Sequence, residues 1–177
     1  MRPTNPQGKP SDLPADEISE LLCEHVPYRL QHLLDAIPRI PAHCMADNQA
    51  FEAGAVAGRS LLSLLGITYD PKTNGLKDDR NYRPSASGMP DDVKAPDLRG
   101  RFVDRTALTE DETALLTRFI HGVHKSSAHF TWKSNHGLDV ATYRNAASLI
   151  YRLLREHLPE MVEPVSAANR HPSCAQV

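Results

Sequence analysis

Hydrophobic positions recur at helical spacing along most of the chain and predict helices separated by one long irregular segment. Apolar residues three and four positions apart predict a first helix that begins near Asp16. The same spacing predicts further helices over residues 27–36, 43–65, 109–130 and 139–158. No segment alternates convincingly between apolar and polar residues, as a half-buried strand would. The pattern therefore predicts an all-α fold, an antiparallel bundle of four or five helices.

Local signals place the ends of these helices. Pro27 suits the first turn of a helix, where a missing N–H costs no hydrogen bond. Gly66 suits a C-cap after the long helix. Thr109 and Glu112 have the spacing of a capping box, and Asp139 suits the N-cap of the last helix. The helix boundaries are therefore predicted independently of the apolar pattern.

Small residues fill the middle of the third helix, from Ala53 to Gly58. A glycine inside a helix costs about 1 kcal/mol relative to alanine, so such a run needs a reason. We expect another helix to cross closely at this point. A ligand that rests against the bare backbone is the alternative.

Proline-rich and polar ends predict tails around a single domain. Residues 1–13 hold little that could be buried and are expected to be disordered. The helical domain spans residues 14–159, and residues 160–177 form a C-terminal tail. Within the domain, residues 67–108 form a long loop, a length that usually indicates a functional or disordered segment.

The long loop carries few structural signals of its own. Asn74 and Gly75 indicate a turn. Basic residues such as Lys94 and Arg99 alternate with aspartates, which predicts a solvated loop of mixed charge; a flap that contacts RNA or a partner is the alternative. Residues 101–103 either form a short strand or lie across the helices.

Composition excludes several classes of protein. With 40% hydrophobic and 24% charged residues, the chain of 177 residues fits a globular domain. The formal net charge of −2 argues against binding of nucleic acid through the overall charge of the chain. A local basic patch is compatible with this net charge. Neither a secretory leader nor a membrane span is evident, and the three cysteines match no zinc pattern. We therefore expect a cytoplasmic protein with no membrane partner and no cofactor.

Three histidines fall within one stretch of the helix over residues 109–130. His121 lies between His124 and His129 on a helical wheel, about 60° from the first and about 80° from the second. Lys125 precedes His129 by four residues and shares its face. One interpretation is a metal site on His121 and His124, but no carboxylate lies in this stretch and Lys125 would repel a cation. The other is metal-free cleavage of RNA, with a histidine base and a cation near the phosphate.

The segment His124-Lys125-Ser126-Ser127-Ala128-His129, late in a helix, resembles the motif of the HEPN superfamily. That resemblance implies an antiparallel helical bundle, and many such domains are metal-independent ribonucleases of toxin–antitoxin, phage-defence or CRISPR systems. The family's arginine falls on His124 and its polar second residue on Lys125. Arg118 with His124, and Arg152 with His157, have similar spacing.

The resulting hypothesis is an RNA-cleaving or RNA-binding protein of a toxin or phage-defence system. His129 is the expected base, with Lys125, His124 or Arg144 near the phosphate; Arg144 would come from the last helix, if that helix is antiparallel to the histidine helix. The resemblance implies a homodimer with two facing motifs, and an antitoxin is a candidate partner. The alternative is a non-catalytic helical module that binds a partner protein. A metal-dependent hydrolase with a histidine cluster is third.

Overall fold

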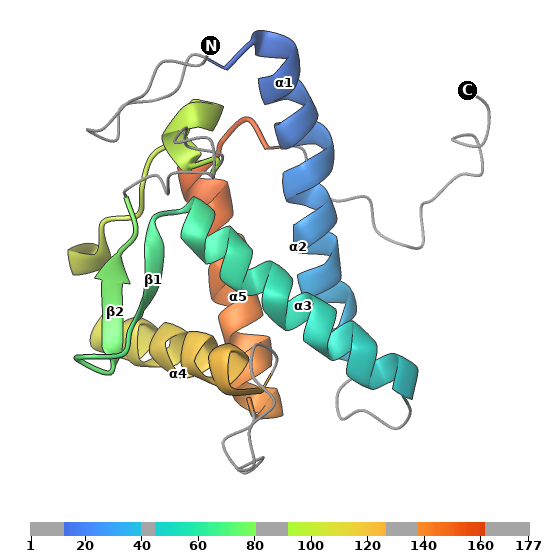
Figure 1. Ribbon diagram of the computed structural model, residues 1–177, viewed down its shortest axis with the longest axis vertical. Coiled ribbons are helices and arrows are strands. Elements are labelled where there is room, and N and C mark those ends of the chain that lie inside the picture. The colour runs from blue at the N-terminus through green and yellow to red at the C-terminus, as the bar shows by residue number, and fades with distance from the viewer. Residues whose placement is uncertain (1–12, 40–44, 81–91, 127–137, 162–177) are drawn as a thin grey trace, which may run out of the picture.

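The computed structural model describes residues 13–39, 45–80, 92–126 and 138–161. Most of these residues are helical, and two short strands form one hairpin (Figure 1). The predicted helical class is confirmed. The all-α prediction missed the hairpin, which lies within the segment predicted as a loop. Most of the two predicted tails lies outside the described residues.

The first helical stretch runs through three segments without a gap. α1 (Ala15–Glu20) leads through a π-helical turn (Leu21–His25) into α2 (Val26–Asp35). The N–H of Val26 donates to the carbonyl of Leu21, five residues back. Pro27 follows directly in the first turn of α2, as predicted. The wider π turn lies where the proline ring and its missing N–H disturb α-helical bonding. A short 3-10 helix (Ile37–Arg39) comes next.

The small residues of α3 (Met45–Leu64) are points of close packing. A Cβ atom on Gly54 would overlap the hydroxyl of Tyr143 from α5, and one on Gly58 would lie 2.8 Å from the Phe119 ring of α4. The prediction of a close helix crossing is therefore confirmed. Gly54 and Gly58 also lie against the His32 carbonyl and Leu33 of α2, so the absent side chains let α3 approach three other helices.

An antiparallel hairpin follows α3. Gly66 ends the helix with a φ of 84°, as predicted for a C-cap glycine. β1 (Ile67–Asp70) then pairs with β2 (Gly75–Asp78), in a register that sets Tyr69 opposite Leu76. Asn74 takes a φ of 51° in the turn, so the turn signal at this position is confirmed. Strands of four residues are too short for their alternation to be recognised in the sequence.

Residues 92–108 return across the helices without forming a strand. Two 3-10 helices, Ala95–Leu98 and Arg105–Ala107, lie in this segment. Between them the N–H of Val103 donates to the Leu65 carbonyl at 3.0 Å. The part of the predicted loop that the structure describes is therefore bonded to the helical body.

Side chains and backbone groups fix the N-terminal ends of the last two helices as predicted, whereas the predicted end of the first near residue 130 lies outside the described residues. α4 (Glu110–Ser126) begins with a complete capping box: the Thr109 N–H donates to the Glu112 carboxylate at 3.0 Å, and the Glu112 N–H donates to the Thr109 hydroxyl at 3.2 Å. α5 (Val140–His157) begins at Asp139, whose carboxylate accepts an N–H of the first turn at 2.8 Å.

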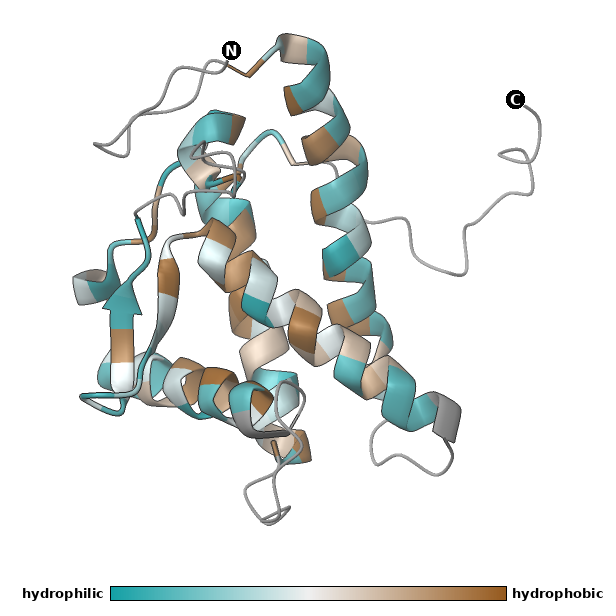
Figure 2. Ribbon diagram, in the orientation of Figure 1, coloured by the Kyte–Doolittle hydropathy of each residue, from teal (hydrophilic) through white to brown (hydrophobic). Residues whose placement is uncertain are grey.

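The helices meet around one apolar core, to which α2, α3, α4 and α5 all contribute. α4 runs across α5 in Figure 1, and the hairpin lies beside α4. Hydrophobic and hydrophilic residues alternate along the helices in Figure 2, so each helix presents one face to this core. No helix among the described residues is long and apolar enough to cross a membrane.

Candidate functional site

Two histidines of α4 lie against the β-hairpin rather than in the core. The Tyr69 ring from β1 stacks on His121, with 5.3 Å between ring centroids and 14° between planes. His124 lies 6.0 Å from the same ring in a tilted arrangement. All three side chains are half-buried. The Tyr69 hydroxyl donates to the Asn74 amide oxygen at 2.6 Å, which holds the aromatic ring in place.

Positive charge lies beside these rings. Arg118 is exposed one turn before His121 and shares its side of α4. It lines an open recess of about 490 Å³ between α4 and the hairpin turn at Asn74. We call the surface formed by Tyr69, Arg118, His121 and His124 the histidine face. It combines flat rings with a cation that is open to solvent.

An acidic group limits this positive region at the hairpin turn. Asp70 accepts the backbone N–H of Lys72 at 3.1 Å and the Thr73 hydroxyl at 3.1 Å. These bonds, led by that from the Lys72 backbone, hold the pKa of the Asp70 carboxyl below its usual value. Asp70 therefore keeps its negative charge at neutral pH, next to the positive charge of Lys72 in the same turn.

The described residues place one member of the predicted catalytic set on the histidine face and bring no two members together. His124 belongs to the histidine face. Lys125 lies in α4, but its side chain is outside the described part, and His129 is outside it entirely. Arg144 is exposed on the second turn of α5. The roles assigned to these four residues therefore stay predictions.

The second arginine–histidine pair of the sequence has structural partners. Arg152 forms ion pairs with Glu112 of α4 and with Glu156. The Nδ1 atom of His157 is buried and finds no hydrogen-bond partner among the described residues. Desolvation, followed by the nearby charge of Arg101, lowers the pKa of His157. Arg152 thus joins α5 to α4, and its contacts are those of a structural residue.

Metal-ligand geometry is not found in the described part of the chain. No group of three or more histidine, cysteine or carboxylate side chains there could hold a metal ion. His121 and His124 have an aromatic ring, Tyr69, beside them. The interpretation of the histidines as a metal site thus has no third ligand among these residues.

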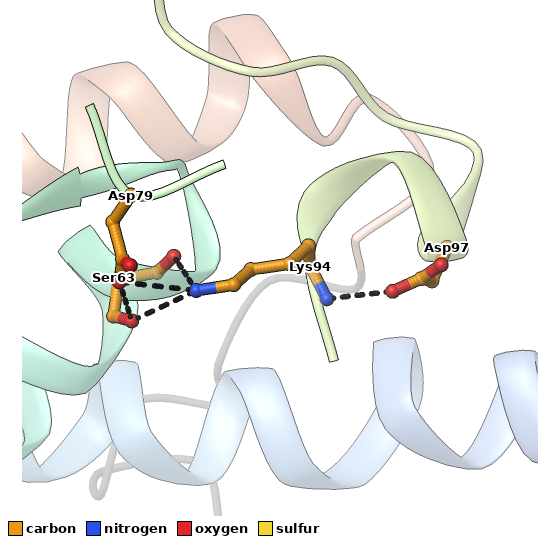
Figure 3. A network of polar contacts seen from close by, with 4 residues as sticks. All are labelled: Ser63, Asp79, Lys94 and Asp97. Carbon is orange, nitrogen blue, oxygen red and sulfur yellow. Dashed lines mark hydrogen bonds and ion pairs between the residues drawn. The ribbon is translucent and has the colours of Figure 1, made fainter. Parts of the chain in front are cut away.

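A buried lysine forms a polar network that the sequence did not predict. Lys94 is 1% exposed, although it comes from the segment expected to be solvated. Its Nζ atom donates to the Ser63 carbonyl at 3.1 Å, the Ser63 hydroxyl at 3.2 Å and an Asp79 carboxylate oxygen at 3.1 Å (Figure 3). Its backbone N–H donates to the Asp97 carboxylate at 2.8 Å. Lys94 therefore ties residues 92–98 to α3 and to the residue after β2.

This network is saturated, which argues against a catalytic serine–lysine pair. The three protons of the Lys94 ammonium match its three acceptors. The Ser63 hydroxyl donates its own proton to Asp79 at 2.7 Å. Because its Nζ atom already donates to three acceptors, Lys94 is not placed to accept a proton from Ser63. We interpret the network as a structural clamp.

Comparison of the chain with protein-family models, with curated proteins and with solved structures finds no match. Functional reasoning therefore rests on the residues and their geometry.

Proposed function

We propose that the protein binds single-stranded RNA on the histidine face. The observation that carries the proposal is the stack of Tyr69 on His121, with His124 beside it. Flat aromatic and imidazole rings are surfaces on which unpaired bases stack, and nearby cations attract the phosphate backbone. Exposed Arg118 supplies one such cation on the same helix.

The proposal extends to metal-independent RNA cleavage, as the HEPN resemblance implies. The close approach of Leu138 to Gly122 supports it, because it brings the start of α5 beside the last turn of α4. Lys125 and Arg144 belong to these two regions. An antiparallel bundle of four or five helices, a homodimer with facing motifs, and a cytoplasmic toxin or phage-defence role all belong to this proposal. His129 remains the proposed base.

Fluorescence anisotropy with a labelled single-stranded RNA tests the binding proposal. Arg118→Ala and His121→Ala should each weaken binding about tenfold, since one stacked base or one phosphate contact contributes about 1–3 kcal/mol. Arg99→Ala is the matched control, because this exposed arginine pairs with Glu160 beside the end of α5. Binding should weaken as salt rises. Equal affinity of all four proteins would contradict the proposal.

Cleavage is tested separately, with wild type and His129→Ala, each with and without EDTA. Cleavage that survives EDTA and disappears in the variant supports a metal-free ribonuclease. Loss of cleavage in EDTA would instead favour the metal-dependent hydrolase. Absence of both RNA binding and cleavage would leave the partner-binding module as the better hypothesis.

A further inference from the structure

A second site lies on the other side of β1. Successive residues of a strand face opposite ways, so Tyr69 reaches the histidine face while Thr68 faces away from it. Thr68 lines a cavity of about 560 Å³ between the π turn with α2, the second half of α3, and residues 92–94. This volume is typical of pockets that hold small molecules.

Lys94 joins two walls of this cavity. Its side chain spans from residues 92–98 to Ser63 of α3, and both Lys94 and Ser63 line the cavity wall (Figure 3). The ion pair with Asp79 is nearly enclosed, so it resists opening by solvent. Lys94 therefore holds these two walls of the cavity at a fixed separation.

Arginines from two helices flank the cavity. Arg59 of α3 is half-buried there, and the described part of the chain provides it with no hydrogen-bond or ion-pair partner. Arg29 of α2 donates to the carbonyl of His25 at 3.2 Å but has no carboxylate partner there. Asp92 is the acidic residue of the lining, and it has an interaction of its own. The arginines therefore give the cavity an excess of positive charge, even with Asp92 counted.

The remaining walls are largely aliphatic. Leu21 and Val26 face the cavity from the first helical stretch, and Val56, Leu64 and Leu98 face it from the other side. Among the described residues, no tyrosine, phenylalanine or tryptophan lines it, and the one ring present, the imidazole of His25, is exposed beside Glu20. The combination of two arginines with aliphatic walls suits a ligand that has an apolar body and one anionic head group.

We infer that this cavity binds an amphipathic anion, with a phosphate or carboxylate head held by Arg29 and Arg59 and an aliphatic body against the leucine and valine side chains. Guanidinium groups match the planar or forked geometry of these head groups. The site is independent of the proposed RNA surface, because no residue of the histidine face lines it.

Isothermal titration of the full chain tests this inference with three probes: octyl phosphate, octanoate and inorganic phosphate. Octyl phosphate or octanoate should bind, and inorganic phosphate should bind more weakly because it leaves the aliphatic walls uncovered. Comparison of the first two probes distinguishes a phosphate site from a carboxylate site. Absence of binding by both alkyl probes at millimolar concentration would overturn the inference.

Variants locate the binding. Arg59→Ala and Arg29→Ala should each weaken it about tenfold, the loss expected for one charged hydrogen-bonding group. Ser60→Phe should also weaken it by filling the cavity from an exposed position on α3 without any change of charge. Arg99→Ala is the control with unchanged affinity. Thermal melting confirms that each variant is folded. Unchanged affinity in Arg59→Ala, Arg29→Ala and Ser60→Phe would refute binding in this cavity.

Discussion

Removal of the buried ammonium by Lys94→Met should strongly destabilise the protein. The variant keeps most of the aliphatic volume of the side chain but deletes three hydrogen bonds and one half of an ion pair. Asp79, whose side chain is only 13% exposed, then loses its ion pair with Lys94 and keeps the hydrogen bond from Ser63. Breaking such a buried pair costs about 3–5 kcal/mol.

Urea unfolding followed by circular dichroism measures this loss. The same change should lower the melting temperature by roughly 6–20 °C, since a domain of this size loses about 2–4 °C for each kcal/mol. Lys77→Met is the matched control, because Lys77 is exposed on β2. Its free energy of unfolding should stay within about 0.5 kcal/mol of wild type.

A double-mutant cycle separates the ion pair from general damage. Asp79→Asn alone leaves the Lys94 charge buried, whereas Lys94→Met combined with Asp79→Asn removes both charges. The double variant should therefore lose at least about 1.5 kcal/mol less stability than the sum of the two single losses. A loss below about 1 kcal/mol for Lys94→Met, or strict additivity in the cycle, would refute the clamp.

Three further perturbations test other contacts. Gly54→Ala should destabilise by about 1–3 kcal/mol in urea unfolding despite its better helix propensity, because the new methyl group overlaps the Tyr143 hydroxyl and crowds the His32 carbonyl. In a Tyr143→Phe background the loss should shrink but not vanish, and an equal loss in both backgrounds would contradict the overlap with Tyr143. Asp139→Ala should cost about 1 kcal/mol by loss of the α5 cap, and an unchanged melting temperature would disprove that role. Burial lowers the pKa of His157, so the folded state favours the neutral ring; its contribution to stability is complete above the unfolded pKa of about 6.5 and declines as pH falls toward the lower folded value. His157→Asn should flatten the loss of stability below pH 6.5, and identical pH profiles by thermal melting would exclude this histidine as the cause.

Prediction from the sequence succeeded where the interacting groups are neighbours along the chain. Thr109 and Glu112 cap α4, Asp139 caps α5, and Gly66 ends α3, each as expected. These features depend on hydrogen bonds or backbone angles within about four residues, so residue type and spacing determine them. The apolar periodicity likewise determined the helical class.

The functional surfaces depended on contacts between segments far apart in sequence. The sequence placed His121 and His124 on one helix, but only the fold set Tyr69 of the hairpin against them. In the sequence, Lys94 is one charged residue among many in a polar segment. Its apolar neighbours Val93 and Ala95 give a weak indication of its burial. Its burial became possible because the folded chain brings Ser63 and Asp79 to its ammonium, which removes the cost of an unpaired buried charge. The spacing of apolar residues along the chain therefore determined the helices. Tertiary packing decided which polar groups face solvent, which polar groups contact each other, and where the cavity lies.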